Sequence, residues 1–103
     1  MTRQVAMVRY KVHADRAAEN ETAIRRVFEQ LAREQPSGLR YGAFKGSDGQ
    51  TFIHFVVTEG QDNNPLNKLD AFQAFTAGVR SRCEELPVRI ELTEVGSFHL
   101  IDA

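Results

Sequence analysis

Hydrophobic and polar residues alternate along the first part of the chain. Val8, Tyr10 and Val12 fall on one side of an extended segment, and polar residues occupy most of the positions between them. A period of two is typical of a β-strand that turns one face toward a core. The pattern therefore predicts a first strand over residues 5–12.

The period then changes to that of an amphipathic helix over residues 15–35. Apolar side chains recur at positions i, i+3, i+4 and i+7, and they are Ile24, Val27, Phe28 and Leu31. We expect Asp15 or Asn20 to cap the start of this helix, because both types accept hydrogen bonds from free backbone N–H groups. Pro36 and Gly38 are expected to end it.

Residues 38–59 read as one antiparallel hairpin. Two runs rich in aromatic and β-branched residues, 39–45 and 51–58, flank the turn sequence Gly46-Ser47-Asp48-Gly49. With Lys45 opposite Gln50, Tyr41 lies opposite His54, which places a phenol and an imidazole on one face. The other face then carries Phe44, Ile53, Phe55 and Val57.

A second helix is expected to start at Pro65, capped by Asn64 or Asn67. Its apolar stripe consists of Leu69, Phe72, Phe75, Thr76, Val79 and Cys83, and Arg82 is assigned to the polar side. Gly78 costs this helix about 1 kcal/mol unless a neighbour packs closely against it. Pro87 is expected to end the segment, and residues 88–100 read as a long last strand.

The predicted order is β-α-β-β-α-β, the ferredoxin-like arrangement, in one α+β domain over residues 1–103. Right-handed crossovers place both helices on one face of a four-stranded antiparallel sheet, with the first and third strands central. The expected helix-facing residues are Val8, Tyr10, Val12, Phe44, Ile53, Phe55, Val57, Val88, Ile90 and Leu92. The opposite face then carries Leu39, Tyr41, Phe52 and Val56, which would be left in water. We therefore predict a homodimer that covers this face.

Composition removes several classes of function. The net charge is −1 and the pI about 6.3, so the electrostatic attraction that drives nucleic-acid binding is missing. No apolar run has the length of a signal peptide or a membrane span, which predicts no membrane partner and a cytoplasmic location. Cys83 stands alone and cannot form an internal disulfide.

The element order and the segment Ala71-Phe72-Gln73-Ala74-Phe75 resemble the dimeric α+β barrel superfamily, and within it the antibiotic biosynthesis monooxygenase-like proteins. The resemblance implies two sheets that form a barrel across a dimer, and a pocket between helices and sheet in each subunit. Activities in the superfamily include cofactor-independent oxygenation of aromatic compounds and haem degradation. The haem-degrading branch uses a Trp, and this chain has none.

Three side chains are candidates for chemistry: Tyr10, Tyr41 and His54. An imidazole beside a phenol can move protons near neutral pH, but a histidine that only stabilises an interface is the favoured reading of His54. Tyr10 could orient an aromatic substrate, although a core tyrosine is the more common finding. The candidate ligand-binding residues are Phe28, Phe44, Phe55, Phe72 and Phe75, although plain core is the more common use of such a set.

No cofactor or metal is expected. His13, His54 and His99 lack the spacing of metal ligands. The sequence therefore leaves three functions open: a cofactor-independent monooxygenase acting on an aromatic or polycyclic molecule, a non-catalytic binding protein for such a molecule, or a structural homodimer.

Overall fold

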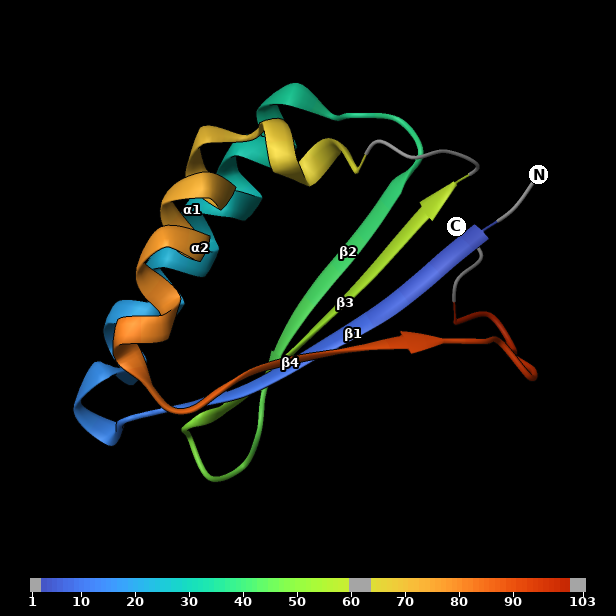
Figure 1. Ribbon diagram of the computed structural model, residues 1–103. Helices are drawn as coiled ribbons and strands as arrows, with labels where there is room; N and C mark the ends of the chain where they lie inside the picture. Colours follow the sequence, from blue (N-terminus) through green and yellow to red (C-terminus); the bar gives the residue numbers. More distant parts are fainter. Residues whose placement is uncertain (1–2, 60–63, 101–103) are drawn as a thin grey trace.

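The computed structural model describes residues 3–59 and 64–100, and it has the predicted order of elements (Figure 1). Residues 60–63, in the polar connection between the predicted hairpin and the second predicted helix, lie outside the described residues, as does Ile101 just beyond the predicted last strand. The elements are β1 (Arg3–Val12), η1 (Ala14–Arg16), α1 (Ala17–Glu34), β2 (Leu39–Lys45), β3 (Thr51–Glu59), η2 (Pro65–Lys68), α2 (Asp70–Arg82) and β4 (Cys83–Leu92). Here η marks a single turn of 3₁₀ helix.

The four strands form one antiparallel sheet in the order β2-β3-β1-β4. β1 and β3 are central, which confirms that prediction. Both helices lie on the same face of the sheet, α1 beside α2 (Figure 1). This is the predicted ferredoxin-like arrangement.

Asp48 fixes the hairpin turn between β2 and β3. Its Oδ1 accepts the backbone N–H groups of Gln50 (2.9 Å) and Thr51 (2.8 Å). The hydrogen bond from the Thr51 hydroxyl to Oδ2, together with these backbone bonds, holds the pKa of Asp48 down at about 2. Gly49 adopts φ 74°, a conformation that other residues resist. The turn is longer than predicted, so Lys45 pairs with Phe52 rather than with Gln50.

The predicted faces of the hairpin were wrong. β1 pairs with β3 so that Tyr10 is opposite Phe52 and Val8 is opposite His54. The helices therefore cover the side of the hairpin that carries Leu39, Tyr41, Phe52, His54 and Val56. The physical reason is that His54 and the tyrosines satisfy their polar atoms by bonding one another, which lets them lie inside.

Neither helix covers the outer face of the sheet, and this face carries many apolar side chains. It carries the residues that we expected beneath the helices, namely Phe44, Ile53, Phe55, Val57, Val88, Ile90 and Leu92, together with Val5 and Met7. Phe44 is 61% exposed and Phe55 is 38% exposed. The need to cover one apolar face thus remains, but the residues that create it are different.

The helix boundaries differ in detail from the prediction. Neither Asp15 nor Asn20 caps α1, because Arg16 stands at its N-cap and Asn20 is fully buried inside it. Gln35 ends α1 in a left-handed conformation. Asn64 does act as a cap, with its side chain accepting the N–H of Leu66, but it caps η2 and α2 begins only at Asp70.

The last strand starts earlier than predicted and ends sooner. Cys83 is its first residue rather than part of α2, and it ends at Leu92. Pro87 lies inside β4, which is possible because β4 is an edge strand and needs no N–H donor on its open side. Within the described part of the chain, neither helix combines the length and hydrophobicity of a membrane span.

Candidate functional site

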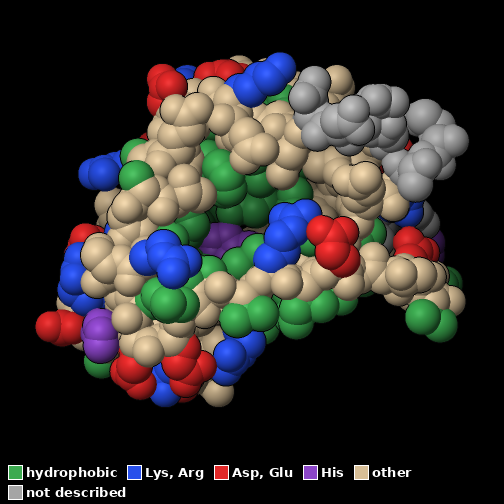
Figure 2. Space-filling model, viewed as in Figure 1, with side chains coloured by type: hydrophobic (Ala, Val, Ile, Leu, Met, Phe, Trp, Pro, Cys, Tyr) green, Lys and Arg blue, Asp and Glu red, His purple; other side chains and the backbone are tan. Residues whose placement is uncertain are grey.

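A cavity of about 420 Å³ lies between α2 and the helix-facing side of the sheet. Figure 2 shows it as a hollow with hydrophobic side chains on its walls and a histidine at its floor. Phe72, Phe75 and Val79 of α2 form its roof, and Tyr10 and His54 belong to its floor. A volume of this size suits a small organic molecule.

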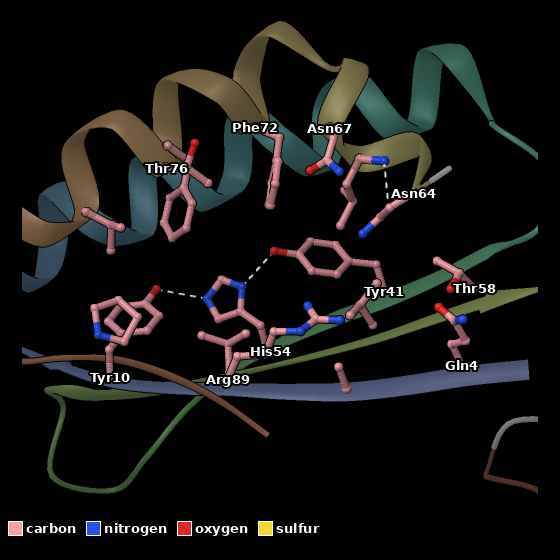
Figure 3. Close-up of a pocket in the computed structure, with 17 residues that line it drawn as sticks. Gln4, Tyr10, Tyr41, His54, Thr58, Asn64, Asn67, Phe72, Thr76 and Arg89 are labelled. Atoms are coloured by element: carbon pink, nitrogen blue, oxygen red, sulfur yellow. Dashed lines mark hydrogen bonds between the residues drawn. The ribbon is translucent and has the colours of Figure 1, made fainter. Parts of the chain in front are cut away.

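His54 lies between the two tyrosines of the chain and is hydrogen-bonded to both (Figure 3). Its Nε2 is 2.8 Å from the Tyr10 hydroxyl, and its Nδ1 is 2.6 Å from the Tyr41 hydroxyl. The three residues come from β1, β2 and β3, and all three line the cavity. The structure thus brings together the three residues that were the candidates for chemistry, although Tyr10 was expected on the opposite face from the other two.

The network continues behind Tyr10 into the helices. The amide Nδ2 of Asn20 donates to the Tyr10 hydroxyl (2.9 Å), and the Asn20 Oδ1 accepts from Arg82 Nε (3.0 Å). Asn20 is 0% exposed and Arg82 is 5% exposed. A chain of five polar side chains therefore runs from α2 through α1 and the sheet to the cavity.

Aromatic rings enclose this polar chain. Phe52 stacks on Tyr10 with ring centroids 5.6 Å apart, and Phe75 lies 5.4 Å from the His54 ring. Phe28 stacks on Tyr41 at 5.1 Å, and Phe72 meets Tyr41 edge-on at 6.3 Å. This packing leaves His54 only 5% exposed.

The five predicted ligand-binding phenylalanines divide into three groups. Phe72 and Phe75 line the cavity as predicted. Phe28 packs against Tyr41 without being part of the cavity wall. Phe44 and Phe55 were assigned wrongly, since they lie on the outer face, where their rings contact each other edge-on at 6.3 Å.

Burial determines the protonation of the site. It lowers the pKa of His54 from 6.5 to about 4, so the imidazole is neutral at pH 7. Burial also raises the pKa of Tyr10, against the opposing effects of the Asn20 hydrogen bond and the Arg82 charge. The pKa of Tyr41 is raised by burial and by the proximity of Tyr10. All three rings are therefore uncharged at pH 7.

The rest of the cavity wall is polar at one end. Gln4, Thr58, Asn64 and Asn67 lie toward the end of the pocket away from Tyr10, and Thr76 of α2 lies on the Tyr10 side (Figure 3). Arg89 of β4 also lines the cavity, and its Nε donates to Glu91 Oε2 at 3.2 Å. The guanidinium supplies a positive charge at the pocket while its ion pair is exposed to solvent.

Among residues 3–59 and 64–100, no three His, Cys, Asp or Glu side chains are grouped as metal ligands would be. His13 follows the end of β1, where its Nδ1 lies 3.8 Å from Glu84, and His99 lies against Phe98. Burial raises the pKa of the Cys83 thiol, which favours its protonated form. The chemistry available in the cavity is therefore that of His54, the phenols, the amides and Arg89.

Sequence reasoning missed Asn20, Arg82 and Arg89. The first two could have been found from helical spacing. Asn20 lies four residues before Ile24 and Arg82 three residues after Val79, so each lies in line with the apolar stripe of its helix although it is polar. A polar side chain on a buried stripe must find partners inside. Arg89 gave no comparable signal, because it alternates with apolar residues as any exposed strand residue does.

No family model matches the sequence, and no curated protein matches it either. Several solved structures, in contrast, match the fold of this chain. Rv0793 from Mycobacterium tuberculosis is 13% identical and superposes with a TM-score of 0.75 over 93% of this chain and 98% of that one. SnoaB, a cofactor-independent oxygenase from Streptomyces nogalater, is 17% identical, with a TM-score of 0.71 over 96% and 99% of the two chains. A structure described as an antibiotic biosynthesis monooxygenase is 12% identical, with a TM-score of 0.69 over 90% and 99%.

This chain has the antibiotic biosynthesis monooxygenase-like fold. The resemblance drawn from the sequence is thereby confirmed at the level of fold. At identities below a fifth, the monooxygenase-like fold says where a ligand pocket can lie, and the residues in that pocket must carry any statement about activity.

Proposed function

We propose that the protein binds an aromatic or polycyclic small molecule in the cavity beneath α2 and oxygenates it without a cofactor. The single observation that carries the proposal is the position of His54 and its two phenol partners on the floor of a cavity roofed by Phe72 and Phe75. Flat apolar ligands suit such walls, and the polar groups orient them. The likeness of fold to SnoaB supports the reaction class.

Oxygenation without a cofactor requires a substrate that supplies its own electrons. A CH₂ group between aromatic rings can lose a proton, and the carbanion can add O₂ to give a peroxide. Loss of water from the peroxide leaves a carbonyl, so one oxygen atom enters the product and the other leaves as water. The protein has to hold the substrate, favour its anion and exclude bulk water.

The described residues can perform those tasks. Tyr41 can hydrogen-bond a substrate oxygen, and Arg89 adds a positive charge that favours a substrate anion. His54 is a weak base while the pocket is empty, because burial depresses its pKa. An anion bound beside it would favour the imidazolium, so deprotonation of the substrate and protonation of His54 would support each other.

A second function is favoured by one observation, the engagement of both His54 nitrogens. A base whose lone pair already accepts a hydrogen bond, and whose pKa is about 4, is poorly placed to take a proton. Binding of the same class of ligand without conversion is the function that this geometry would serve.

The test is a panel of anthrone, quinol and flavonoid-like compounds, screened by thermal shift and followed by oxygen uptake on each hit. We expect at least one compound to raise the melting temperature, and Phe72→Ala to weaken that effect. Phe44→Ala, which truncates the same residue type on the outer face, is the control that should keep it. Hits without oxygen uptake would favour the binding function, and the absence of hits would refute both.

We also propose that two copies of the chain associate through the outer face of the sheet. Four large apolar side chains on or beside this face are well exposed: Phe44 (61%), Phe55 (38%), Val88 (56%) and Ile90 (43%). Burying what remains exposed of each side chain would gain a fraction of the about 1.5 to 3 kcal/mol that a fully exposed side chain of this kind gains on burial. Beyond β4, Val95, Phe98 and Leu100 are at least 80% exposed and could extend the contact onto the partner.

A further inference from the structure

The hydrogen bonds that link Arg82 to the cavity have a defined direction. An arginine side chain can only donate, so the Asn20 atom that faces Arg82 Nε at 3.0 Å must be the amide oxygen. The Asn20 NH₂ group therefore points the other way and donates to the Tyr10 hydroxyl at 2.9 Å. Arg82 thus fixes which end of the Asn20 amide meets Tyr10.

This orientation decides where the Tyr10 proton goes. The Tyr10 oxygen already accepts from Asn20, and its own proton needs an acceptor because Tyr10 is only 1% exposed. His54 Nε2, at 2.8 Å, is the acceptor that the described residues offer. Nε2 must then lack a proton, and the one proton of the neutral imidazole must be on Nδ1.

The Nδ1 proton is in turn donated to the Tyr41 oxygen at 2.6 Å. The hydroxyl proton of Tyr41 is therefore free, and no other residue within 3–59 and 64–100 hydrogen-bonds to that group. Tyr41 lines the cavity, so this proton is available to a ligand. In the reverse arrangement Tyr41 would donate to Nδ1 and could only accept from a ligand.

We propose that Asn20 and Arg82 are positioning residues that hold His54 with its proton on Nδ1, so that Tyr41 offers a hydrogen-bond donor to the cavity. The pocket then selects ligands that present an acceptor oxygen at Tyr41, such as a carbonyl or a phenolate, over ligands that present an N–H group. This selection rests on the proposed ligand site but not on the proposed reaction.

The residues packed around Arg82 hold its side chain in the position from which it bonds Asn20. A Cβ on Gly78 would lie 2.9 Å from Arg82 Nη1, so a glycine at this point of α2 leaves the space that the guanidinium occupies. Arg82 also lies over the Phe75 ring, 5.6 Å from its centroid, and its nearest carboxylate oxygen, on Glu19, is 4.0 Å away. A buried arginine with so weak an ion pair is costly, and orienting Asn20 accounts for its presence.

Asn20→Asp is the variant that should reverse the direction of the hydrogen bonds between Asn20 and Tyr41. The carboxylate keeps the shape of Asn20 and the contact with Arg82, but it accepts the Tyr10 proton instead of donating to Tyr10. Tyr10 then accepts from His54 Nε2–H, Nδ1 loses its proton, and Tyr41 donates to Nδ1. One atom exchanged in α1 should thus move a proton on the imidazole in β3.

The measurement is the ¹⁵N NMR spectrum of the ligand-free protein at neutral pH, which distinguishes a protonated ring nitrogen from an unprotonated one. His13→Gln and His99→Gln leave His54 as the only histidine. We expect Nδ1 to be protonated in this background and Nε2 after Asn20→Asp. Asn67→Asp adds the same charge to the cavity wall at a residue that is not hydrogen-bonded to His54 or the tyrosines. This variant should leave the proton on Nδ1.

Two results would overturn the proposal. The first is a background spectrum with the proton on Nε2 or on both nitrogens, and it decides the matter even if Asn20→Asp does not fold. The second is a folded Asn20→Asp protein in which the proton stays on Nδ1. Neither measurement involves a substrate or oxygen, so failure here is separate from failure of the proposed reaction.

The ligand preference is tested with 1-indanone, which offers only an acceptor, and indole, which offers an N–H donor on a ring system of similar size. NMR titration should show that the unaltered protein favours 1-indanone, and that Asn20→Asp shifts the ratio of the two dissociation constants toward indole by about tenfold. Tyr41→Phe should abolish the discrimination. An unchanged ratio in Asn20→Asp, or no binding of either compound, would refute the selection.

Discussion

The buried neutral histidine should make the stability of the protein depend on pH in a defined window. His54 is 5% exposed, and its pKa falls from 6.5 to about 4 on folding. Between these two values the unfolded chain binds a proton that the folded protein does not. The free energy of unfolding therefore decreases as the pH falls from 6.5 toward 4 and levels off below that range.

The size of the effect follows from the shift. Lowering the pH from 7 to 5 should cost about 2 kcal/mol, and the full shift corresponds to about 3 kcal/mol. Such a loss is a large fraction of the 5 to 15 kcal/mol that stabilises a typical domain. The carboxylates whose pKa values are lowered, Glu19, Glu21 and Asp48, lose their contributions at lower pH, mostly below 4.5.

His54→Gln removes the titrating group and should flatten the dependence between pH 7 and pH 5, although its stability at pH 7 will be lower because the tyrosines lose their partner. Urea unfolding followed by circular dichroism at fixed protein concentration measures both quantities. His13→Gln, on an exposed histidine, is the matched control and should retain the slope. A slope in His54→Gln equal to that of the unaltered protein would show that His54 is not the source.

Two further predictions concern the two faces of the sheet. Phe55→Asp places a charge at the centre of the outer face and should convert the proposed dimer to a monomer in light scattering at micromolar concentration; a monomeric unaltered protein would refute the dimer itself. In that Phe55→Asp background, Phe52→Ala should lower the free energy of unfolding by about 3 to 5 kcal/mol, because the Phe52 ring is 2% exposed beneath Tyr10. Phe44→Ala should cost about 1 kcal/mol or less, and equal losses would contradict the assignment of faces.

The order of elements was predictable because periodicity changes clearly along the chain, from two in β1 to 3.6 in α1 and back to two in the hairpin. The assignment of faces was not. Both sides of β3 carry large apolar side chains, with Phe52 and Val56 on one and Ile53 and Phe55 on the other. Alternation cannot show which of two hydrophobic faces lies beneath the helices. The face that carries His54 and Tyr41 was predicted to point away from the helices because it is the more polar of the two, and that prediction was wrong.

The candidate site shows the same limit. Tyr10, Tyr41 and His54 were singled out for their chemistry, but their convergence depends on the register between β1 and β3, which no local pattern encodes. Asn20 was taken for a helix cap because asparagine is common there. Its observed partner is Arg82, which lies 62 positions further along the chain and meets it only in the folded state.

Tyr10 is one of the largest fully buried side chains, and it also lines the cavity that a ligand would occupy. Mutations that reshape such a wall must also repack the interior, so new specificities could not arise here as freely as they do in proteins that bind through surface loops. Evolution of a different ligand preference would be expected to proceed from the exposed amide side chains at the rim, Gln4 and Asn67, which can change with little loss of folding free energy.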